Sequence, residues 1–176
     1  MNKFKNGFTH TLTFKGRKKL VSGFTLLELL IVVAIIGILT SIIMISLSDT
    51  RNKGEDTAVK SNLNTIRGVS ELFYANNGNS FLPVGGSTFS IAACPVYNAS
   101  GTNMLSADKT IADAIAEAIK RGANGSSCYN SNIAWAVAVG LKSSVTASWC
   151  VDSGGNSKQV SSAPGGAING ATFSCN

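Results

Sequence analysis

Histidine and acidic residues are scarce in this sequence. The only histidine is His10, and nine Asp and Glu residues are spread over 176 positions. Catalysis that relies on histidine as a base is therefore excluded from everything after residue 10. The sequence also lacks a P-loop and a dinucleotide-binding glycine motif. We expect a protein that is not an enzyme and that binds no cofactor.

Acidic residues are absent before Phe24, where six of the 15 cations lie: Lys3, Lys5, Lys15, Arg17, Lys18 and Lys19. The other nine cations are matched by the nine acids, so the formal charge of +6 belongs to residues 1–23. A basic segment directly before an apolar run tends to stay in the cytoplasm. The charge therefore predicts a membrane orientation, and it gives no support for direct binding of nucleic acid.

Long apolar runs are absent apart from one, which extends from Phe24 to Leu47 and reads FTLLELLIVVAIIGILTSIIMISL. As a helix it would be about 36 Å long, enough to cross a hydrocarbon layer of about 30 Å. Residues 1–23 contain no apolar core of a secretory signal, and no A-x-A-like cleavage site follows the run before Asp49. We expect the run to be retained as a membrane anchor.

Glu28 is the only ionisable residue within this run. A carboxylate at the centre of a bilayer costs about 2.5–3.5 kcal/mol, and less near its edge. Either Glu28 lies shallow enough to reach the headgroups, or it awaits a cationic partner. A cut before Phe24 would create such a cation, the new α-amino group. Paired between neighbouring subunits, the two charges would be neutralised and could set the register.

The segment KKLVSGFTLLELLIVVAIIGIL, residues 18–39, closely resembles the prepilin cleavage and assembly motif of type IV pilins and the related pseudopilins. The resemblance implies that a prepilin peptidase removes a basic leader, residues 1–23, by cutting after Gly23. It further implies that the same enzyme methylates the amine of Phe24, and that Glu28 is the filament assembly residue. Two features differ from many family members: the leader is longer than in common type IVa pilins, and no proline precedes Pro83. Subclass IVa or IVb therefore stays open.

The same resemblance implies the function, partners and location. The chain would be a structural subunit of a type IV pilus-like, homo-oligomeric filament that polymerises through its N-terminal helix. Its partners would be the prepilin peptidase, a cytoplasmic assembly ATPase and a platform membrane protein. The precursor would cross the cytoplasmic membrane once, and the filament would lie at the cell surface.

Apolar residues continue beyond the polar stretch Asp49–Asp56, about 3.6 positions apart: Val59, Leu63, Ile66, Val69 and Phe73. Asn76, Asn77 and Gly78 supply a stop signal. We expect one helix from Phe24 to about Asn77, whose first part, residues 24–47, lies in the membrane or the filament core. Residues 48–78 would be its amphipathic part. The alternative is two helices with a hinge near Gly54.

Residues 79–176 are predicted to form a globular head. Ile111, Ile115 and Ile119 make a helical stripe that Ser106 or Asp108 could cap and Gly122 could end. Alternating large side chains predict two strands, from Ile133 to Val139 and from Val145 to Val151, and Gly154–Gly155 permits a hairpin into Lys158–Val160. The predicted fold class is α+β, pilin-like: a long N-terminal helix packed on a small antiparallel sheet.

All four cysteines lie in this head: Cys94, Cys128, Cys150 and Cys175. They lack C-x-x-C spacing and histidine neighbours, so two disulfides in an oxidising compartment are favoured over a zinc site. The residues themselves leave three pairings open. Pilin heads often close their C-terminal region with a disulfide, and this resemblance favours Cys150–Cys175, which leaves Cys94–Cys128.

Two other functions fit part of the sequence. A pseudopilin of a type II secretion system would use the same N-terminal motif, and some major pseudopilins bind Ca²⁺. The segment Asp152–Ser157 lacks the several carboxylates of a strong calcium site, so we expect a plain turn and no metal. A monomeric, membrane-anchored surface-binding module would explain the anchor and the disulfides. It would give no reason for Glu28 or for the Gly23–Phe24 junction.

Overall fold

The computed structural model describes residues 23–176, except for the side chains of residues 44–46. The expected leader, residues 1–22, lies outside the described residues. The chain divides into two compact units, with the boundary between Ser41 and Ile42. We describe each unit by itself.

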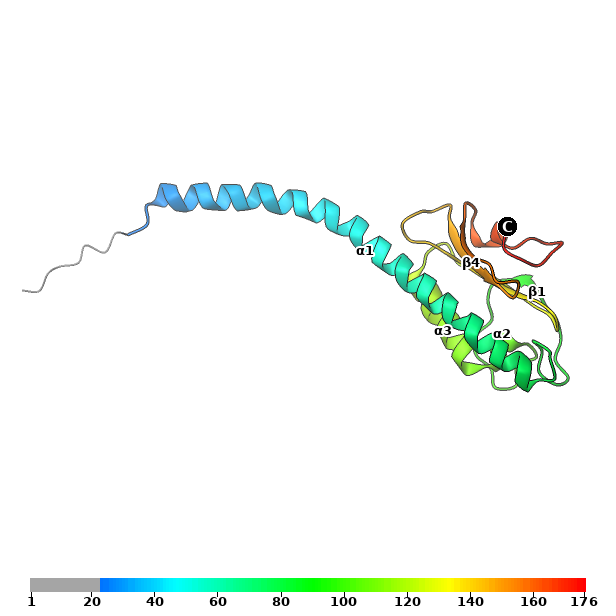
Figure 1. Cartoon of the computed structure of the whole chain (residues 1–176). Coiled ribbons are helices and arrows are strands. Elements are labelled where there is room, and N and C mark those ends of the chain that lie inside the picture. Colours follow the sequence, from blue (N-terminus) through cyan, green and yellow to red (C-terminus); the bar gives the residue numbers. More distant parts are fainter. Residues whose placement is uncertain (1–22) are drawn as a thin grey trace, which may run out of the picture. The chain divides into compact units, whose positions relative to one another are not determined.

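Helix α1 runs from Leu26 to Asn76 (Figure 1). Gly54 lies inside it, so the structure shows one continuous element in place of two helices with a hinge there. The helix begins two residues after the predicted Phe24, because Thr25 caps its first turn. At the other end, Gly78 and Asn79 adopt positive φ angles of 67° and 62° and turn the chain away.

The part of α1 that belongs to the second unit carries the predicted apolar stripe. Val59, Leu63 and Ile66 are fully buried, and Val69 and Phe73 pack against the same core. The opposite face is mostly polar, although Leu72 is 61% exposed, as expected of a helix that covers one side of a sheet.

The head contains a five-stranded antiparallel sheet in the order β1-β2-β3-β4-β5. Its strands are β1 (Phe89–Ala92), β2 (Ser126–Asn130), β3 (Trp135–Gly140), β4 (Ser148–Asp152) and β5 (Ser157–Val160). Three further helices are α2 (Met104–Ala107), α3 (Lys109–Arg121) and α4 (Pro164–Ala167). Each strand pairs with the next along the chain, which is the simplest antiparallel arrangement.

The two faces of the sheet are covered by different elements. Trp135, Val137 and Val139 of β3 join the larger core, which α1 and α3 complete. Ala136 and Ala138, the intervening residues, join a smaller cluster with Ala167 and Ile168 at the C-terminal side. This alternation along β3 follows from the two-residue period of a strand. The α+β class predicted from the sequence is therefore confirmed.

Two strand starts were predicted too early. Ile133 is 76% exposed and Val145 is 77% exposed, and both precede the strands they were expected to begin. Ile133 lies in a tight turn in which the Ser131 amide donates to the carbonyl of Ala134 over 2.7 Å. In the sequence, large and small side chains alternate from Ile133 and from Val145 onward. In the structure, the backbone forms turns at these two residues and becomes extended only from Trp135 and Ser148.

The caps of α3 resolve the alternatives left by the sequence. The side chain of Asp108 accepts a hydrogen bond from the amide of Ile111 over 3.0 Å, so Asp108 is the N-cap. Gly122 ends the helix, as expected. Ile111 and Ile115 are buried, whereas Ile119 is 36% exposed and lies at the edge of the stripe.

Candidate functional site

The start of α1 is closed by a reciprocal pair of hydrogen bonds between Thr25 and Glu28. The amide of Glu28 donates to the Thr25 hydroxyl over 3.2 Å, and the amide of Thr25 donates to Oε2 of Glu28 over 2.8 Å. The Thr25 hydroxyl also donates to the same carboxylate oxygen over 3.0 Å. This capping box satisfies two backbone amides that the first helical turn leaves free. It places the Glu28 carboxylate beside the backbone that follows Phe24.

The expected cleavage junction lies just before this cap. Gly23 and Phe24 precede α1, and the Phe24 side chain is 84% exposed. A Cβ atom built on Gly23 would meet nothing within 4 Å. The junction is therefore an open, non-helical peptide, which is the form that a peptidase can bind.

The apolar part of α1 has no protein partner to cover it within the described chain. Every large apolar side chain described between Leu26 and Leu47 is at least 46% exposed. By length and composition, α1 contains a candidate membrane span. A helix that is apolar on all sides requires lipid or other apolar helices around it.

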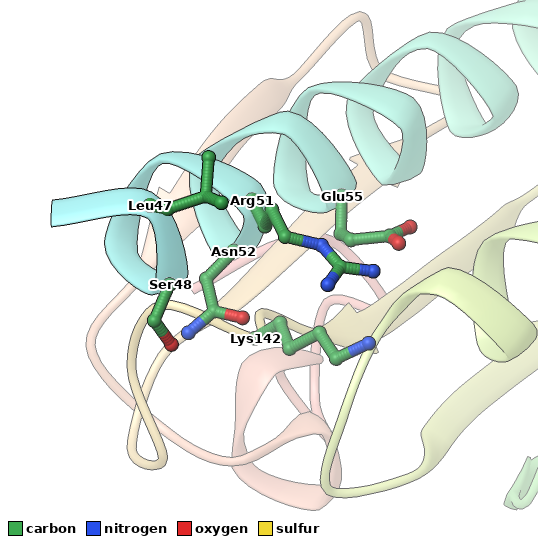
Figure 2. A pocket seen from close by; sticks show the side chains of 6 residues that line it. All are labelled: Leu47, Ser48, Arg51, Asn52, Glu55 and Lys142. Atoms are coloured by element: carbon green, nitrogen blue, oxygen red, sulfur yellow. The ribbon is translucent and has the colours of Figure 1, made fainter. Parts of the chain in front are cut away.

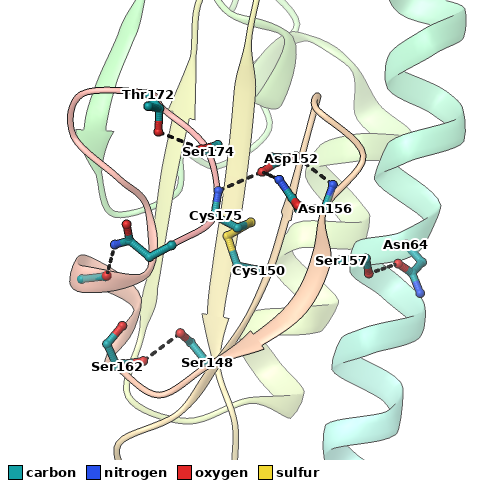
Figure 3. Close-up of a disulfide and its surroundings, with 12 residues drawn as sticks. Asn64, Ser148, Cys150, Asp152, Asn156, Ser157, Ser162, Thr172, Ser174 and Cys175 are labelled. Carbon is teal, nitrogen blue, oxygen red and sulfur yellow. Dashed lines mark hydrogen bonds between the residues drawn. A yellow bond between two sulfur atoms is a disulfide. The ribbon is translucent and has the colours of Figure 1, made fainter.

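Two disulfides link segments of the head to one another. Cys94 is bonded to Cys128 over 2.02 Å, which ties the segment after β1 to β2. Cys150 is bonded to Cys175 over 2.06 Å, which ties the C-terminal segment to β4 (Figure 3). These are the pairs that the pilin resemblance favoured among the three open pairings.

Asp152, which the sequence offered as a possible calcium ligand, has a structural place in the described head. Its carboxylate accepts from the Asn156 amide over 3.0 Å, from Asn156 Nδ2 over 2.7 Å and from the Cys175 amide over 2.8 Å (Figure 3). Both oxygens thus hold the β4–β5 turn and the C-terminal segment together. Within residues 23–176, no group of three or more His, Cys, Asp or Glu side chains is arranged to hold a metal ion.

Asp56 is a structural residue that the sequence reasoning missed. It is 4% exposed, and its carboxylate accepts from the amide of Lys142 over 2.6 Å and from the amide of Ser143 over 3.2 Å. The Ser143 hydroxyl also donates to it. The signal was present, because Asp56 lies three positions before Val59 and thus on the buried stripe. We call these contacts the Asp56 clamp.

The family model described as the prokaryotic N-terminal methylation motif matches residues 18–44. The chain is 40% identical over 57 residues to the type IV wide pilus major component PilA4 of Thermus thermophilus. That match covers 32% of this chain and 44% of the relative, so it spans less than half of either protein. No solved structure matches the chain.

The matched motif contains the Gly23–Phe24 junction, the capping box and most of the apolar run. The observed fold, a long N-terminal helix followed by a small antiparallel sheet, is pilin-like. The chain thus combines a prokaryotic N-terminal methylation motif, a similarity over part of its length to a type IV pilus component, and a pilin-like fold.

Proposed function

We propose that this chain is the precursor of a subunit of a type IV pilus-like filament. A prepilin peptidase would remove residues 1–23 by cutting after Gly23 and would methylate the amine of Phe24. The apolar part, residues 24–47, would hold the subunit in the cytoplasmic membrane and then enter the filament core. Residues 48–78 would connect it to the head, residues 79–176, which would form the outer surface of the filament.

The observation that carries this proposal is the state of the Glu28 carboxylate. Oε2 caps its own helix, whereas Oε1 has no hydrogen-bond partner among the described residues. Oε1 is therefore available to a cation of another chain. The amine of a processed neighbour at Phe24 is such a cation, and its charge would survive methylation because a secondary amine remains basic.

Inside a filament core, a pair of opposite charges would be more favourable than a lone carboxylate. Around α1, neighbouring copies would bury Glu28 among apolar side chains, where an unpaired carboxylate is costly. Breaking a buried ion pair by removing one partner typically costs about 3–5 kcal/mol. A subunit that docks with its amine away from a neighbouring Glu28 would pay this penalty, so the pair would select one axial register.

Assembly would need partners that supply energy and position. We propose a cytoplasmic ATPase and a platform membrane protein for this purpose, in addition to the peptidase. The support is the motif in residues 18–44 and the similarity to a pilus component. The filament itself would be extracellular and built of many copies of the chain.

Substitution of Glu28 tests the proposal in cells that make the filament. Glu28→Gln keeps the size of the side chain and removes its charge, and Glu71→Gln makes the same change at an exposed position of α1 outside the apolar run. We expect Glu28→Gln to insert in the membrane but to lower the yield of sheared surface filaments at least tenfold. Glu71→Gln should leave the yield unchanged. Equal yields from both variants would contradict the proposed role of Glu28.

A further inference from the structure

A polar groove lies beside α1 just beyond its apolar part. It is an open cavity of about 330 Å³, lined by Leu47, Ser48, Arg51, Asn52, Glu55 and Lys142 (Figure 2). Its size is at the lower end of that of small-ligand sites. We call it the Arg51–Lys142 groove. All its residues belong to the second unit of the chain.

The groove has two cations, Arg51 and Lys142, that pair with no acid among the described residues. In the described part of the chain, neither Arg51 nor Lys142 takes part in an ion pair. Figure 2 shows both side chains extending in the same direction across the groove. Glu55 is the acid that lines it, and its carboxylate lies 3.4 Å from the guanidinium of Arg121. The groove is therefore lined by two positive groups, and the one acid that lines it forms an ion pair with Arg121.

The backbone of Lys142 is held beside the groove by hydrogen bonds to α1. The Asp56 clamp fixes the backbone of Lys142 and Ser143 against α1. The carbonyl of Val145, in the same loop, accepts a hydrogen bond from Asn124 Nδ2 over 2.9 Å. The Val145 side chain is 77% exposed at this fixed position. An apolar side chain in a loop that also carries a cation suits the boundary between headgroups and acyl chains.

The position of the groove along α1 matches the level of lipid headgroups. Arg51 lies four residues beyond Leu47, the end of the apolar run, and hence about 6 Å farther along the helix. The headgroup layer extends about 5–7 Å beyond the hydrocarbon core on each side. Arginine and lysine also reach several ångströms from their backbone to place their charge at this layer.

We propose that the Arg51–Lys142 groove binds the phosphodiester of a membrane lipid while the subunit waits in the bilayer. The guanidinium of Arg51 would donate two hydrogen bonds to the phosphate oxygens, and the ammonium of Lys142 would add a second positive charge. Because the basic leader stays in the cytoplasm, the lipid would belong to the leaflet on the far side of the membrane. This inference rests on the membrane-held stage of the proposed function.

The contact can be measured directly in the intact processed subunit, residues 24–176. The chain is reconstituted in bilayers of phosphatidylethanolamine and phosphatidylglycerol, with ¹³C in the arginine guanidinium groups and ¹⁵N in the lysine ammonium groups. Solid-state NMR then measures the dephasing of each signal by lipid ³¹P. We expect strong dephasing for one arginine among Arg51, Arg67 and Arg121, and for one lysine among the six that follow residue 23.

Variants assign these signals. Arg51→Gln should remove the dephased arginine signal, and Lys142→Gln should remove the dephased lysine signal. Arg67→Gln is the matched control, because Arg67 lies 16 residues farther along α1, or about 24 Å, and should leave both dephased signals in place. Absence of dephasing in the parent chain would overturn the proposal, whether or not any variant folds.

Further arms separate the alternatives. Bilayers of a phosphate-free glycolipid with inorganic phosphate in the buffer should give no dephasing; equal dephasing there would overturn the lipid as the source. If Arg51→Gln abolishes sheared filaments while the parent shows no ³¹P contact, the groove serves a neighbouring subunit and the proposal is wrong. Flotation of the chain with the vesicles tests membrane insertion itself, and its failure would count against the proposed function instead.

Discussion

Removal of the Asp56 carboxylate, which is buried where α1 faces the head, should destabilise the head. The clamp joins α1 to the β3–β4 loop across 86 residues of sequence, through three donors on Lys142 and Ser143. Hydrogen bonds to a charged acceptor contribute about 1.5–3 kcal/mol each, and their losses do not simply add. Because the loop lies at the surface, water can replace part of what is lost. We therefore expect Asp56→Ala to lower the free energy of unfolding by about 3 kcal/mol.

Asp56→Asn gives a finer test of the same reasoning. The amide keeps one acceptor oxygen but turns an NH₂ group toward a backbone N–H of the loop, so at least one hydrogen bond is lost and two donor groups face each other. We expect a loss of about 2 kcal/mol. Glu55→Gln is the matched control one residue away, because Glu55 lies in a partly exposed ion pair with Arg121 that should contribute little.

The measurement is urea unfolding of the processed chain in detergent micelles with both disulfides intact. Hydrogen exchange at the amides of Lys142 and Ser143 gives a local readout, and a loss of about 2 kcal/mol corresponds to roughly 30-fold faster exchange. If Asp56→Ala unfolds within about 0.5 kcal/mol of the parent and these amides stay protected, the clamp does not hold the loop as described.

Three further predictions concern the head. A Cβ atom at Gly140 would overlap the carbonyl oxygen of Ala123, so Gly140→Ala should cost about 2 kcal/mol or more; Gly165→Ala, where nothing lies within 4 Å, is the control in the same urea assay. Replacement of both Cys150 and Cys175 by serine opens a link of 25 residues and should cost about 3.5 kcal/mol; an unchanged urea midpoint would contradict this. The hydrogen bond from Arg121 lowers the pKa of the Glu117 carboxyl below its usual 4.5, so its stabilising effect is present above that pH and is lost as the pH falls through the lowered pKa. The urea midpoints of Glu117→Gln and the parent should therefore differ at pH 7 and converge as the pH falls through this lowered pKa, and a constant difference would argue against this pair.

The sequence predicted the long helix because its signals agree with one another. The apolar run, the stripe from Val59 to Phe73 and the stop at Asn76–Gly78 all indicate one element, and α1 covers Leu26–Asn76. Two strands were also predicted in part, because Trp135–Val139 and Trp149–Val151 alternate between a large core face and a small outer face. These elements are predictable because the spacing of their apolar residues directly reflects which side chains are buried.

Other parts of the head could not be predicted from local patterns. Strand β2, with the sequence SSCYN, is mostly polar, although four of its five residues are buried. Its Asn130 accepts from the Met104 amide over 2.8 Å, a contact between segments that no sequence period indicates. Asp152 likewise serves a C-terminal segment 23 residues away. Polar residues that are buried by contacts with distant parts of the chain produce no periodic pattern in the sequence.

Glu28 and Thr25 show both sides of this limit. Glu28 was recognised as a functional candidate because a lone carboxylate in an apolar run is costly. Its capping box with Thr25 also has a sequence signature, T-x-x-E at the start of an apolar helix, which the prediction did not include. The structure adds that one carboxylate oxygen is engaged by its own chain, which the motif alone does not indicate.

The most direct test of the account is intact-mass and N-terminal analysis of the protein in surface material sheared from its native cells. We predict a chain that begins at Phe24, carries one additional methyl group on its amine and retains both disulfides. A surface chain that still carries residues 1–23, or that begins elsewhere in cells with an active prepilin peptidase, would contradict the proposed processing and the filament role built on it.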